Sequence, residues 1–141
     1  MSDCIFCDIL AGKLTSSVVS KDDMCWAFMD IQPVNPGHIL VVPAFHVSSL
    51  AELHPELGAH MFKTAQRIAK ALRRTALKCE GINFFLADGR VAGQDILHVH
   101  LHVIPRHRGD GFGLKLGSSY GYRPPRDELD MVAAEIKRVL G

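Results

Sequence analysis

The stretch His98-Val99-His100-Leu101-His102-Val103-Ile104 alternates polar and apolar side chains and predicts a β-strand. Side chains alternate between the two faces of a strand, so the three histidines share one face and the residues between them face the core. Neighbouring imidazoles on such a face are about 6.6 Å apart. Three histidines in strict alternation, directly after a loop that contains Gly93, indicate a functional site rather than ordinary half-buried residues.

Two kinds of chemistry suit this histidine face. Neighbouring histidines can share a zinc ion, but His98 and His102 would lie about 13 Å apart, which makes three ligands to one ion awkward. Alternatively, a neutral imidazole can attack phosphorus or a carbonyl carbon without an activating base, while a second histidine protonates or orients the leaving group. Backbone N–H groups of the preceding loop could then bind phosphate oxygens.

The rest of the chain predicts an α+β fold with a mostly antiparallel sheet. Besides the strand over 98–104, which Pro105 closes, we expect strands over 17–20, 25–30, 38–42 and 82–87, and one or two helical turns over 4–10. A long helix is expected to begin at Pro55 and to be capped by Gly81, and a second amphipathic helix is expected over 127–140. The apolar stripe of the long helix consists of Leu57, Met61, Ala65, Ile68 and Leu72.

The length and the charge of the chain exclude several classes of protein. A chain of 141 residues suits a single domain, 1–141, and its formal net charge of +1 argues against binding of nucleic acid polymers. We find no run of about 18 apolar residues that would cross a membrane. The N-terminal residues do not resemble a secretory signal, so we expect a cytoplasmic protein whose four cysteines stay reduced.

These motifs resemble those of the histidine triad (HIT) family of nucleotide hydrolases and transferases. The family motif His-φ-His-φ-His-φ-φ, in which φ is apolar, is complete at 98–104, and Gly93-Gln94 and the segments 25–31 and 36–43 also fit the family. The resemblance covers about residues 4–108, so that 109–141 is an extension that it matches less closely. It implies the HIT fold, an antiparallel sheet of about five strands with one long helix and a C-terminal helix.

The resemblance also implies a role for individual residues. His100 is expected to attack phosphorus and carry the nucleoside monophosphate as a covalent phosphoramidate, His102 to contact the α-phosphate, and His38 to orient His100 in its reactive tautomer. Asp30 is expected to accept hydrogen bonds from the ribose hydroxyls. The remaining implied nucleotide-binding residues are Phe6, Ile9, Phe28 and Ile31 around the base, and Gly93, Gln94 and Asp95 in the phosphate loop.

Two positions depart from the family pattern. Asp95 stands where the family often has Ser or Thr, and an ionised carboxylate cannot donate a hydrogen bond to phosphate and repels it at close range. Ala87 stands where many members have Asn or Gln. These departures leave room for an alternative, a nucleotide-binding partner protein whose hydrolase activity is vestigial. A third alternative is a hydrolase that uses the histidines as metal ligands.

The motif Cys4-Ile5-Phe6-Cys7 is compatible with three kinds of site. A redox pair is expected beside a thioredoxin-like βαβ pattern, which this chain lacks; the two cysteines could be small core residues, or they could be ligands of a metal ion. Structural zinc takes four ligands. Some family members with this motif carry zinc on two cysteines and two histidines, which implies a structural zinc site of Cys4, Cys7, His46 and His98.

The activity implied by the resemblance is cleavage of a P–N or P–O–P bond next to a nucleoside 5′-monophosphate, usually AMP. The chemistry itself needs no metal. The expected partner is a small nucleotide, such as AMP, an AMP phosphoramidate or a diadenosine polyphosphate. Because the family commonly pairs its long helices and extends its sheet across two subunits, a homodimer is also expected.

Overall fold

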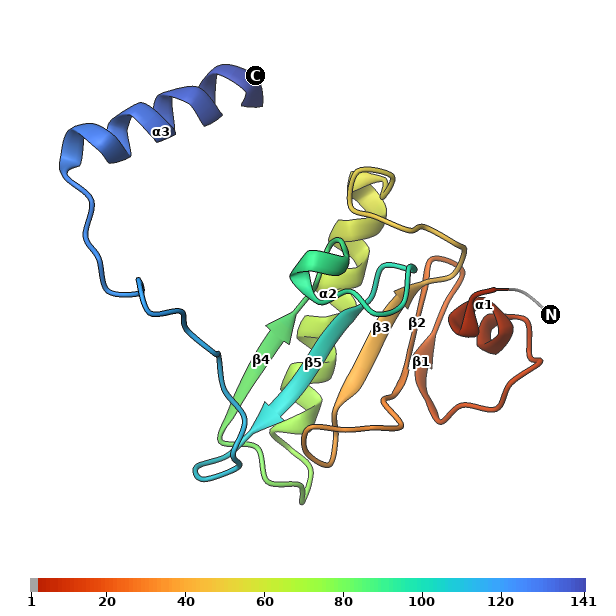
Figure 1. Cartoon of the computed structure of the whole chain (residues 1–141). Coiled ribbons are helices and arrows are strands. Elements are labelled where there is room, and N and C mark those ends of the chain that lie inside the picture. Colours follow the sequence, from red (N-terminus) through yellow and green to blue (C-terminus); the bar gives the residue numbers. More distant parts are fainter. Residues whose placement is uncertain (1–2) are drawn as a thin grey trace. The chain divides into compact units, whose positions relative to one another are not determined.

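Five antiparallel strands form one sheet in the computed structural model, which describes residues 3–141 (Figure 1). The strand order is β1-β2-β3-β5-β4, which confirms the predicted α+β fold. The strands are β1 (Val18–Lys21), β2 (Cys25–Met29), β3 (Ile39–Pro43), β4 (Gly81–Phe85) and β5 (Leu101–Arg106). The helices are α1 (Ile5–Leu10), α2 (Pro55–Leu72) and α3 (Arg126–Leu140), with a short 3-10 helix at Arg90–Ala92.

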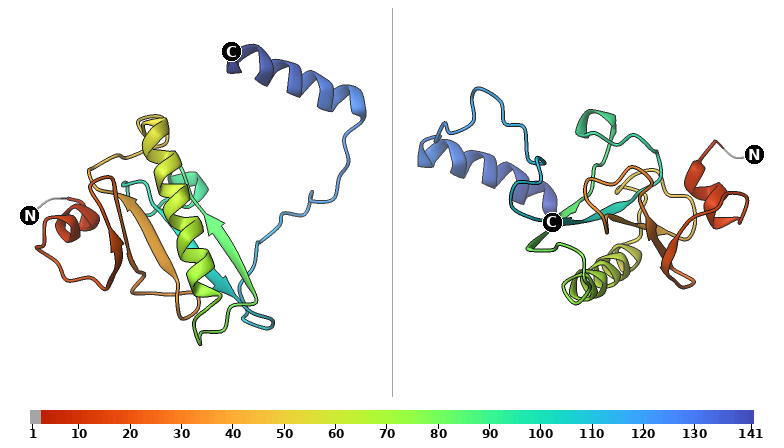
Figure 2. Two further views of the ribbon diagram at one scale, coloured as in Figure 1. Left: turned by 180° about the vertical axis from the view of Figure 1, so that it is seen from behind. Right: turned by 90° about the horizontal axis from the view of Figure 1, so that it is seen from below.

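Helix α2 lies across one face of the sheet (Figure 2). The five residues of the predicted apolar stripe are all buried, and they pack with Val41 and Val103 in the main core. The helix begins at Pro55 as predicted, but it ends at Leu72, and the prediction that Gly81 caps it is wrong. The apolar stripe stops at Leu72 and residues 73–78 are exposed, so no packing surface extends the helix further. Gly81 is instead the first residue of β4.

Strand β3 is buried on both faces because two cores meet on it. Ile39 and Val41 belong to the main core under α2, whereas Leu40 and Val42 belong to a second cluster on the opposite face. This second cluster contains residues of α1. The burial of both faces explains why the sequence of β3 is a continuous apolar run rather than an alternating one.

Strand β5 begins and ends later than the sequence predicts. It starts at Leu101, where pairing with Val41 of β3 begins, and it continues through Pro105 to Arg106. Pro105 does not close the strand because pairing with β3 has already ended there and only β4 is paired beside it. As a result, His102 lies in the strand, while His98 and His100 lie in the segment that leads into it.

The chain divides into two units at Gly111, and the second unit, Phe112–Gly141, contains only α3 and the segment before it. The prediction of a helix at the C-terminal end is confirmed. None of the residues of α3 is buried. The exposed set includes the apolar side of the helix, Leu129, Val132, Ala133, Ile136, Val139 and Leu140. No helix within residues 3–141 has the length and apolar character needed to span a membrane.

Candidate active site

A cavity of about 530 Å³ opens on the face of the sheet opposite α2. Two aromatic residues, Phe6 of α1 and Phe28 of β2, form its buried apolar wall, with ring centroids 5.6 Å apart. Two carboxylates, of Asp30 and Asp95, and the imidazoles of His100 and His102 also line the cavity. Of the residues that the sequence predicts for nucleotide binding, those that line this cavity are Phe6, Ile9, Phe28, Asp30, Ile31, Gly93, Asp95, His100 and His102.

The tautomer of His100 is fixed by a backbone carbonyl. Its Nδ1 lies 2.7 Å from the carbonyl oxygen of His98, and because a carbonyl only accepts hydrogen bonds, Nδ1 must carry the proton. In the neutral imidazole, Nε2 then keeps its lone pair. The side chain is 8% exposed and contacts the ring of Phe6 edge to face. Neutral His100 therefore has an unprotonated Nε2, and its ring is held in one orientation.

A chain of hydrogen bonds fixes the tautomers of His38 and His102. The N–H of Val34 donates to Nδ1 of His38 at 3.0 Å, and burial lowers the pKa of His38, so the neutral ring carries its proton on Nε2. That Nε2 lies 2.8 Å from Nδ1 of His102, which must accept. Burial, then the neighbouring His100 and His38, lower the pKa of His102 to about 4. Neutral His102 consequently carries its proton on Nε2.

The hydrogen bond in the structure differs from the expected contact between His38 and His100, because Nε2 of His38 bonds to Nδ1 of His102. The strand register explains the difference. Ile39 pairs with Val103 and Leu40 with His102, so His38, one residue before β3, lies diagonally across from His102 and farther from His100. The contacts of the structure therefore link His38 to His100 through His102, whose ring lies 5.0 Å from that of His100.

A tight turn at Gly37 positions His38 next to His102. Gly37 has a φ of +98°, and a Cβ at this position would lie 3.0 Å from a side-chain carbon of Leu77 and 3.2 Å from Pro105. Only glycine fits this backbone conformation in so little space. Asp30 lies beside the turn, with its Oδ2 3.5 Å from Nε2 of His38, while its Oδ1 accepts a hydrogen bond from the backbone N–H of Gln32. Oδ2 therefore remains the carboxylate oxygen with capacity to accept from a ligand.

Gln94, which is expected in the phosphate loop, is not among the residues that line the cavity. The side chain is 2% exposed. Its Oε1 accepts from the N–H of Gly89 at 2.8 Å, and its Nε2 donates to the carbonyls of Ser48 at 2.9 Å and Ile96 at 3.1 Å. All these partners are backbone groups, so the buried side chain of Gln94 stabilises the conformation of the loop.

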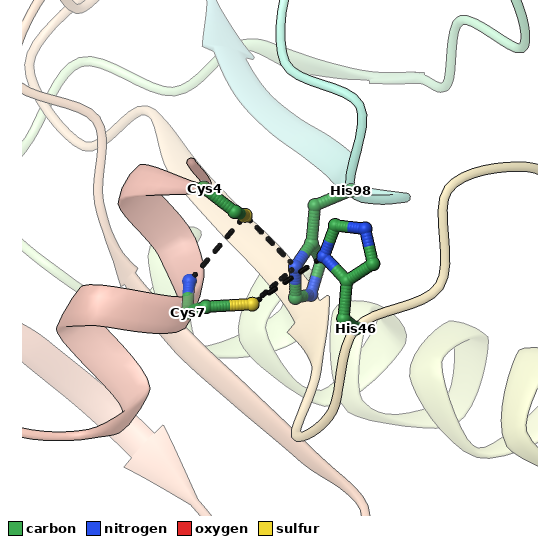
Figure 3. A group of neighbouring side chains, drawn as sticks. All are labelled: Cys4, Cys7, His46 and His98. Carbon is green, nitrogen blue, oxygen red and sulfur yellow. Dashed lines mark hydrogen bonds between the residues drawn. The ribbon is translucent and has the colours of Figure 1, made fainter. Parts of the chain in front are cut away.

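The four sulfur and nitrogen donors expected for zinc come together beside the cavity (Figure 3). They lie within 4.8 Å of one another. Nδ1 of His98 is 3.4 Å from Sγ of Cys4 and 3.6 Å from Sγ of Cys7, and Nδ1 of His46 is 3.4 Å from Sγ of Cys7. Sulfur and nitrogen ligands of a tetrahedral zinc are about 3.6 Å apart, so these four residues fit the ion.

The tautomer of His98 also suits a metal ligand. Its Nε2 donates to the carbonyl of Pro43 at 3.1 Å, which leaves the lone pair of Nδ1 directed at the cysteines. Burial and the nearby Cys4 raise the pKa of the Cys7 thiol to about 11. A thiol ligand must lose its proton to bind, and a bound cation would favour the thiolate. The triad histidines do not gather at one point, since His98 lies with the cysteines and His102 with Asp30 and His38.

Several features of the site could not be read from the sequence. The carbonyls of His98 and Pro43 and the N–H of Val34 set the tautomers, and backbone groups carry no residue-type signal. The loop residues Leu14, Thr15 and Ser16, which also line the cavity, have no motif either. His60, which belongs to none of the motifs, is partly buried, and its Nε2 lies 2.8 Å from Oδ2 of Asp22.

Comparison with known proteins identifies a matching family model and several related sequences. A family model described as the HIT domain matches residues 11–109. An uncharacterized HIT-like protein from Borreliella burgdorferi is 43% identical over 119 residues, which are 84% of this chain and 86% of that protein. The adenylylsulfatase HINT3 of Arabidopsis thaliana is 35% identical over 109 residues, which are 77% of this chain and 55% of that protein.

Solved structures superpose on this chain over nearly its whole length. A member of the HIT family from Bacillus subtilis superposes with a TM-score of 0.87 at 36% identity and covers 99% of both chains. A zinc-bound histidine triad family protein from Mycobacterium smegmatis superposes with a TM-score of 0.76 at 34% identity and covers 96% of both chains. The sheet with its long helix is therefore shared with proteins that carry this domain.

Proposed function

This chain belongs to the HIT family, and we propose that it is a nucleotide hydrolase or transferase that cleaves a P–N or P–O–P bond next to a nucleoside 5′-monophosphate of the AMP type. The observation that carries this proposal is the His100 imidazole. Its Nδ1–H is held by the His98 carbonyl at 2.7 Å, so that the lone pair of Nε2 is free in a residue that lines the cavity. A neutral imidazole in that state is a nucleophile at pH 7.

In the first step, Nε2 of His100 forms a bond to the α-phosphorus while the bond from phosphorus to the leaving group breaks. The leaving group takes the bonding electron pair and a proton from solvent. The positive charge of the resulting phosphorylated imidazolium is stabilised by its Nδ1–H, which donates to the His98 carbonyl. In the second step, a water oxygen or another acceptor bonds to phosphorus, the N–P bond returns its electron pair to His100, and the acceptor's proton goes to solvent.

Other residues of the cavity would bind the nucleotide. The apolar wall with Phe6 and Phe28 suits a base, and Oδ2 of Asp30 suits a ribose hydroxyl. The Nε2–H of neutral His102 can donate to a phosphoryl oxygen, because its Nδ1 is engaged with His38. The backbone N–H of Asp95 is the proposed donor of the phosphate loop, because that of Gly93 already donates to the carbonyl of Arg90 at 3.0 Å.

We include a structural zinc ion on Cys4, Cys7, His46 and His98 in the proposal. The closeness of the four donors and the zinc-bound relative from Mycobacterium smegmatis support it. With four protein ligands the ion has no open position, so it would tie segments together rather than activate water. The chemistry of His100 requires no metal.

A homodimer and a cytoplasmic location complete the proposal. Phe62 of α2 is 54% exposed, and its ring lies 5.5 Å from that of Phe84 on the edge strand β4. A second copy that covers this aromatic pair would remove apolar surface from water and extend the sheet. Within the described residues none of the four cysteines forms a disulfide, which suits a reducing compartment.

The test of this function is the variant His100→Ala, assayed with an AMP phosphoramidate and with AMP. We expect turnover to fall at least about a thousandfold and AMP affinity to stay within a few fold, because the nucleophile is lost while the base and ribose contacts remain. His107→Ala is the matched control, since this histidine lies outside the cavity and should leave turnover unchanged. Near-normal turnover in His100→Ala would contradict the mechanism. AMP binding without turnover in the unmodified protein would favour the alternative, a nucleotide-binding partner protein with vestigial hydrolase activity.

A further inference from the structure

A further group of metal-binding side chains lies on the face of the sheet that α2 covers. It consists of Asp22 in the turn between β1 and β2, Cys25 at the start of β2, and His60 of α2. The ligand atoms of these three residues lie within 4.8 Å of one another. None of them lines the nucleotide cavity, and none belongs to the four expected zinc ligands, so the group is a separate cluster.

Two backbone hydrogen bonds fix the carboxylate of Asp22. Its Oδ1 accepts from the N–H of Met24 at 2.8 Å and from the N–H of Cys25 at 2.9 Å. Its Oδ2 lies 2.8 Å from Nε2 of His60. Among residues 3–141, no lysine or arginine forms an ion pair with this carboxylate. Oδ2 is therefore held toward α2, as second-sphere hydrogen bonds hold a metal ligand, and no permanently charged side chain neutralises it.

Cys25 supplies a sulfur donor from the core side of the cluster. Its side chain is 1% exposed, and its Sγ lies 3.5 Å from Oγ1 of Thr64, one helical turn after His60. A hydroxyl can accept from a thiol and donate to a thiolate, so Thr64 suits both states of the cysteine. Burial raises the pKa of the Cys25 thiol, and the nearby charge of Asp22 raises it further. A divalent cation between these two groups would remove their repulsion and favour the thiolate.

The cluster can be reached from solvent even though Cys25 is buried. The side chains of His60 and Asp22 are 31% and 44% exposed, respectively. A carboxylate and a thiolate together carry two negative charges, and a divalent ion neutralises both. A bound ion would therefore leave no net charge at the edge of the core, where an uncompensated charge is costly.

The donor types indicate which ions would fit. Thiolate and imidazole ligands suit zinc and cobalt, whereas magnesium and calcium take oxygen ligands. Nitrogen and oxygen ligands of a tetrahedral zinc ion are about 3.4 Å apart, so Oδ2 of Asp22 and Nε2 of His60 would move apart by about half an ångström. The exposure of both side chains allows this movement.

We propose that Asp22, Cys25 and His60 form a second metal site, which binds a tetrahedral divalent ion such as zinc with a water molecule in the fourth position. Three protein ligands and an exposed side hold the ion more weakly than the four ligands beside the nucleotide cavity. Dialysis therefore empties this site and leaves the structural zinc in place. The bound ion links the β1–β2 turn to α2 and stabilises that side of the sheet.

Cobalt(II) is the probe for this site, because a thiolate bound to tetrahedral cobalt gives a charge-transfer absorption. The full-length protein is dialysed, its remaining zinc is measured by elemental analysis, and cobalt is then titrated in. The variants are Asp22→Asn and His60→Gln, whose side chains are partly exposed and leave no core cavity when replaced. Asp23→Asn is the matched control, because it removes the same charge from the next, exposed residue of the same turn, which is outside the cluster.

We expect His60→Gln to bind one equivalent of cobalt fewer than the unmodified protein at the same zinc content, with loss of the corresponding charge-transfer absorption. Asp22→Asn should weaken the binding of that equivalent at least about tenfold, since loss of a ligand costs at least as much as loss of a group that orients one. Asp23→Asn should bind cobalt as the unmodified protein does, and excess magnesium should not compete.

Equal cobalt stoichiometry in His60→Gln and the unmodified protein would overturn the proposal, and so would an equal loss of affinity in Asp23→Asn. An additional equivalent that binds without thiolate absorption would place the ion away from Cys25 and would also overturn it. The proposed function does not depend on these outcomes, because His100 and the nucleotide cavity lie on the other face of the sheet.

Discussion

Backbone groups decide which nitrogen of each histidine in this site carries the proton. The carbonyl of His98 fixes His100, the carbonyl of Pro43 fixes His98, and the N–H of Val34 fixes His38. The triad sequence specifies only that imidazoles lie near one another. The three-dimensional path of the main chain leaves one of them with an unprotonated Nε2 and another with the lone pair of its Nδ1 toward the cysteines.

Burial of His102 predicts a pH-dependent stability. Its pKa is about 4 in the folded protein and near 6.5 in the unfolded chain, so below pH 6.5 protons bind the unfolded chain preferentially. The contribution of His102 to the free energy of unfolding is complete above pH 6.5 and is lost as the pH falls toward 4. With a discount for its partial exposure, the loss amounts to about 2 kcal/mol.

Urea unfolding between pH 4 and pH 7 measures this effect. His102→Gln removes the titrating group but keeps an oxygen that can accept from His38, so its stability should fall less steeply over this range. Histidines that do not contact His102, such as His98, titrate in both proteins and cancel in the comparison. Parallel curves for the two proteins would show that His102 is not the buried neutral group described above.

At the scale of elements, periodicity predicted the helices and strands but not where they end. The stripe from Leu57 to Leu72 identified α2, because burial of one helix face repeats every three to four residues. The end of α2 and the start of β5 depend on where packing and pairing partners stop, which lies far away in the sequence. Thus Gly81 was misassigned as a cap, and β5 was expected to begin at His98.

The loop before β5 depends on one buried side chain. Gln94→Leu would leave three backbone groups of residues 48, 89 and 96 without their hydrogen-bond partner. Because an unsatisfied buried polar group costs about 1–3 kcal/mol, we expect a loss of about 3 kcal/mol in the free energy of unfolding. Chemical denaturation measures it, with Gln66→Leu on the exposed side of α2 as the control. Equal, small losses of unfolding free energy in both variants would contradict the stabilising role of Gln94.

At the scale of the whole molecule, the Cys and His cluster joins segments that are distant in the sequence. Cys4 and Cys7 belong to the start of α1, His46 follows β3, and His98 precedes β5. The C-x-x-C motif and the resemblance together predicted the four residues. Their convergence depends on the register of β3 and on the placement of α1, neither of which the motif contains.

Removal of the proposed zinc should therefore lower the stability of the whole unit of residues 3–111. A ligand that binds only the folded chain stabilises it, so a strong chelator should lower the thermal midpoint by at least about 5 °C, and added zinc should restore it. Cys7→Ser should show the lower midpoint without chelator and should respond little to it. One equivalent of zinc per chain is expected by elemental analysis, and a midpoint that ignores the chelator would contradict the site.

The central claim is that His100 bonds covalently to phosphorus, and rapid-quench intact-protein mass spectrometry tests it most directly. Mixing the protein with an AMP phosphoramidate and quenching within the first turnover should increase its mass by one adenylyl group, with the modified peptide containing His100. The adduct should be absent in His100→Ala and should disappear as AMP is released. Rapid AMP release by the unmodified protein with no adduct at any time point, or an adduct on another residue, would contradict the account.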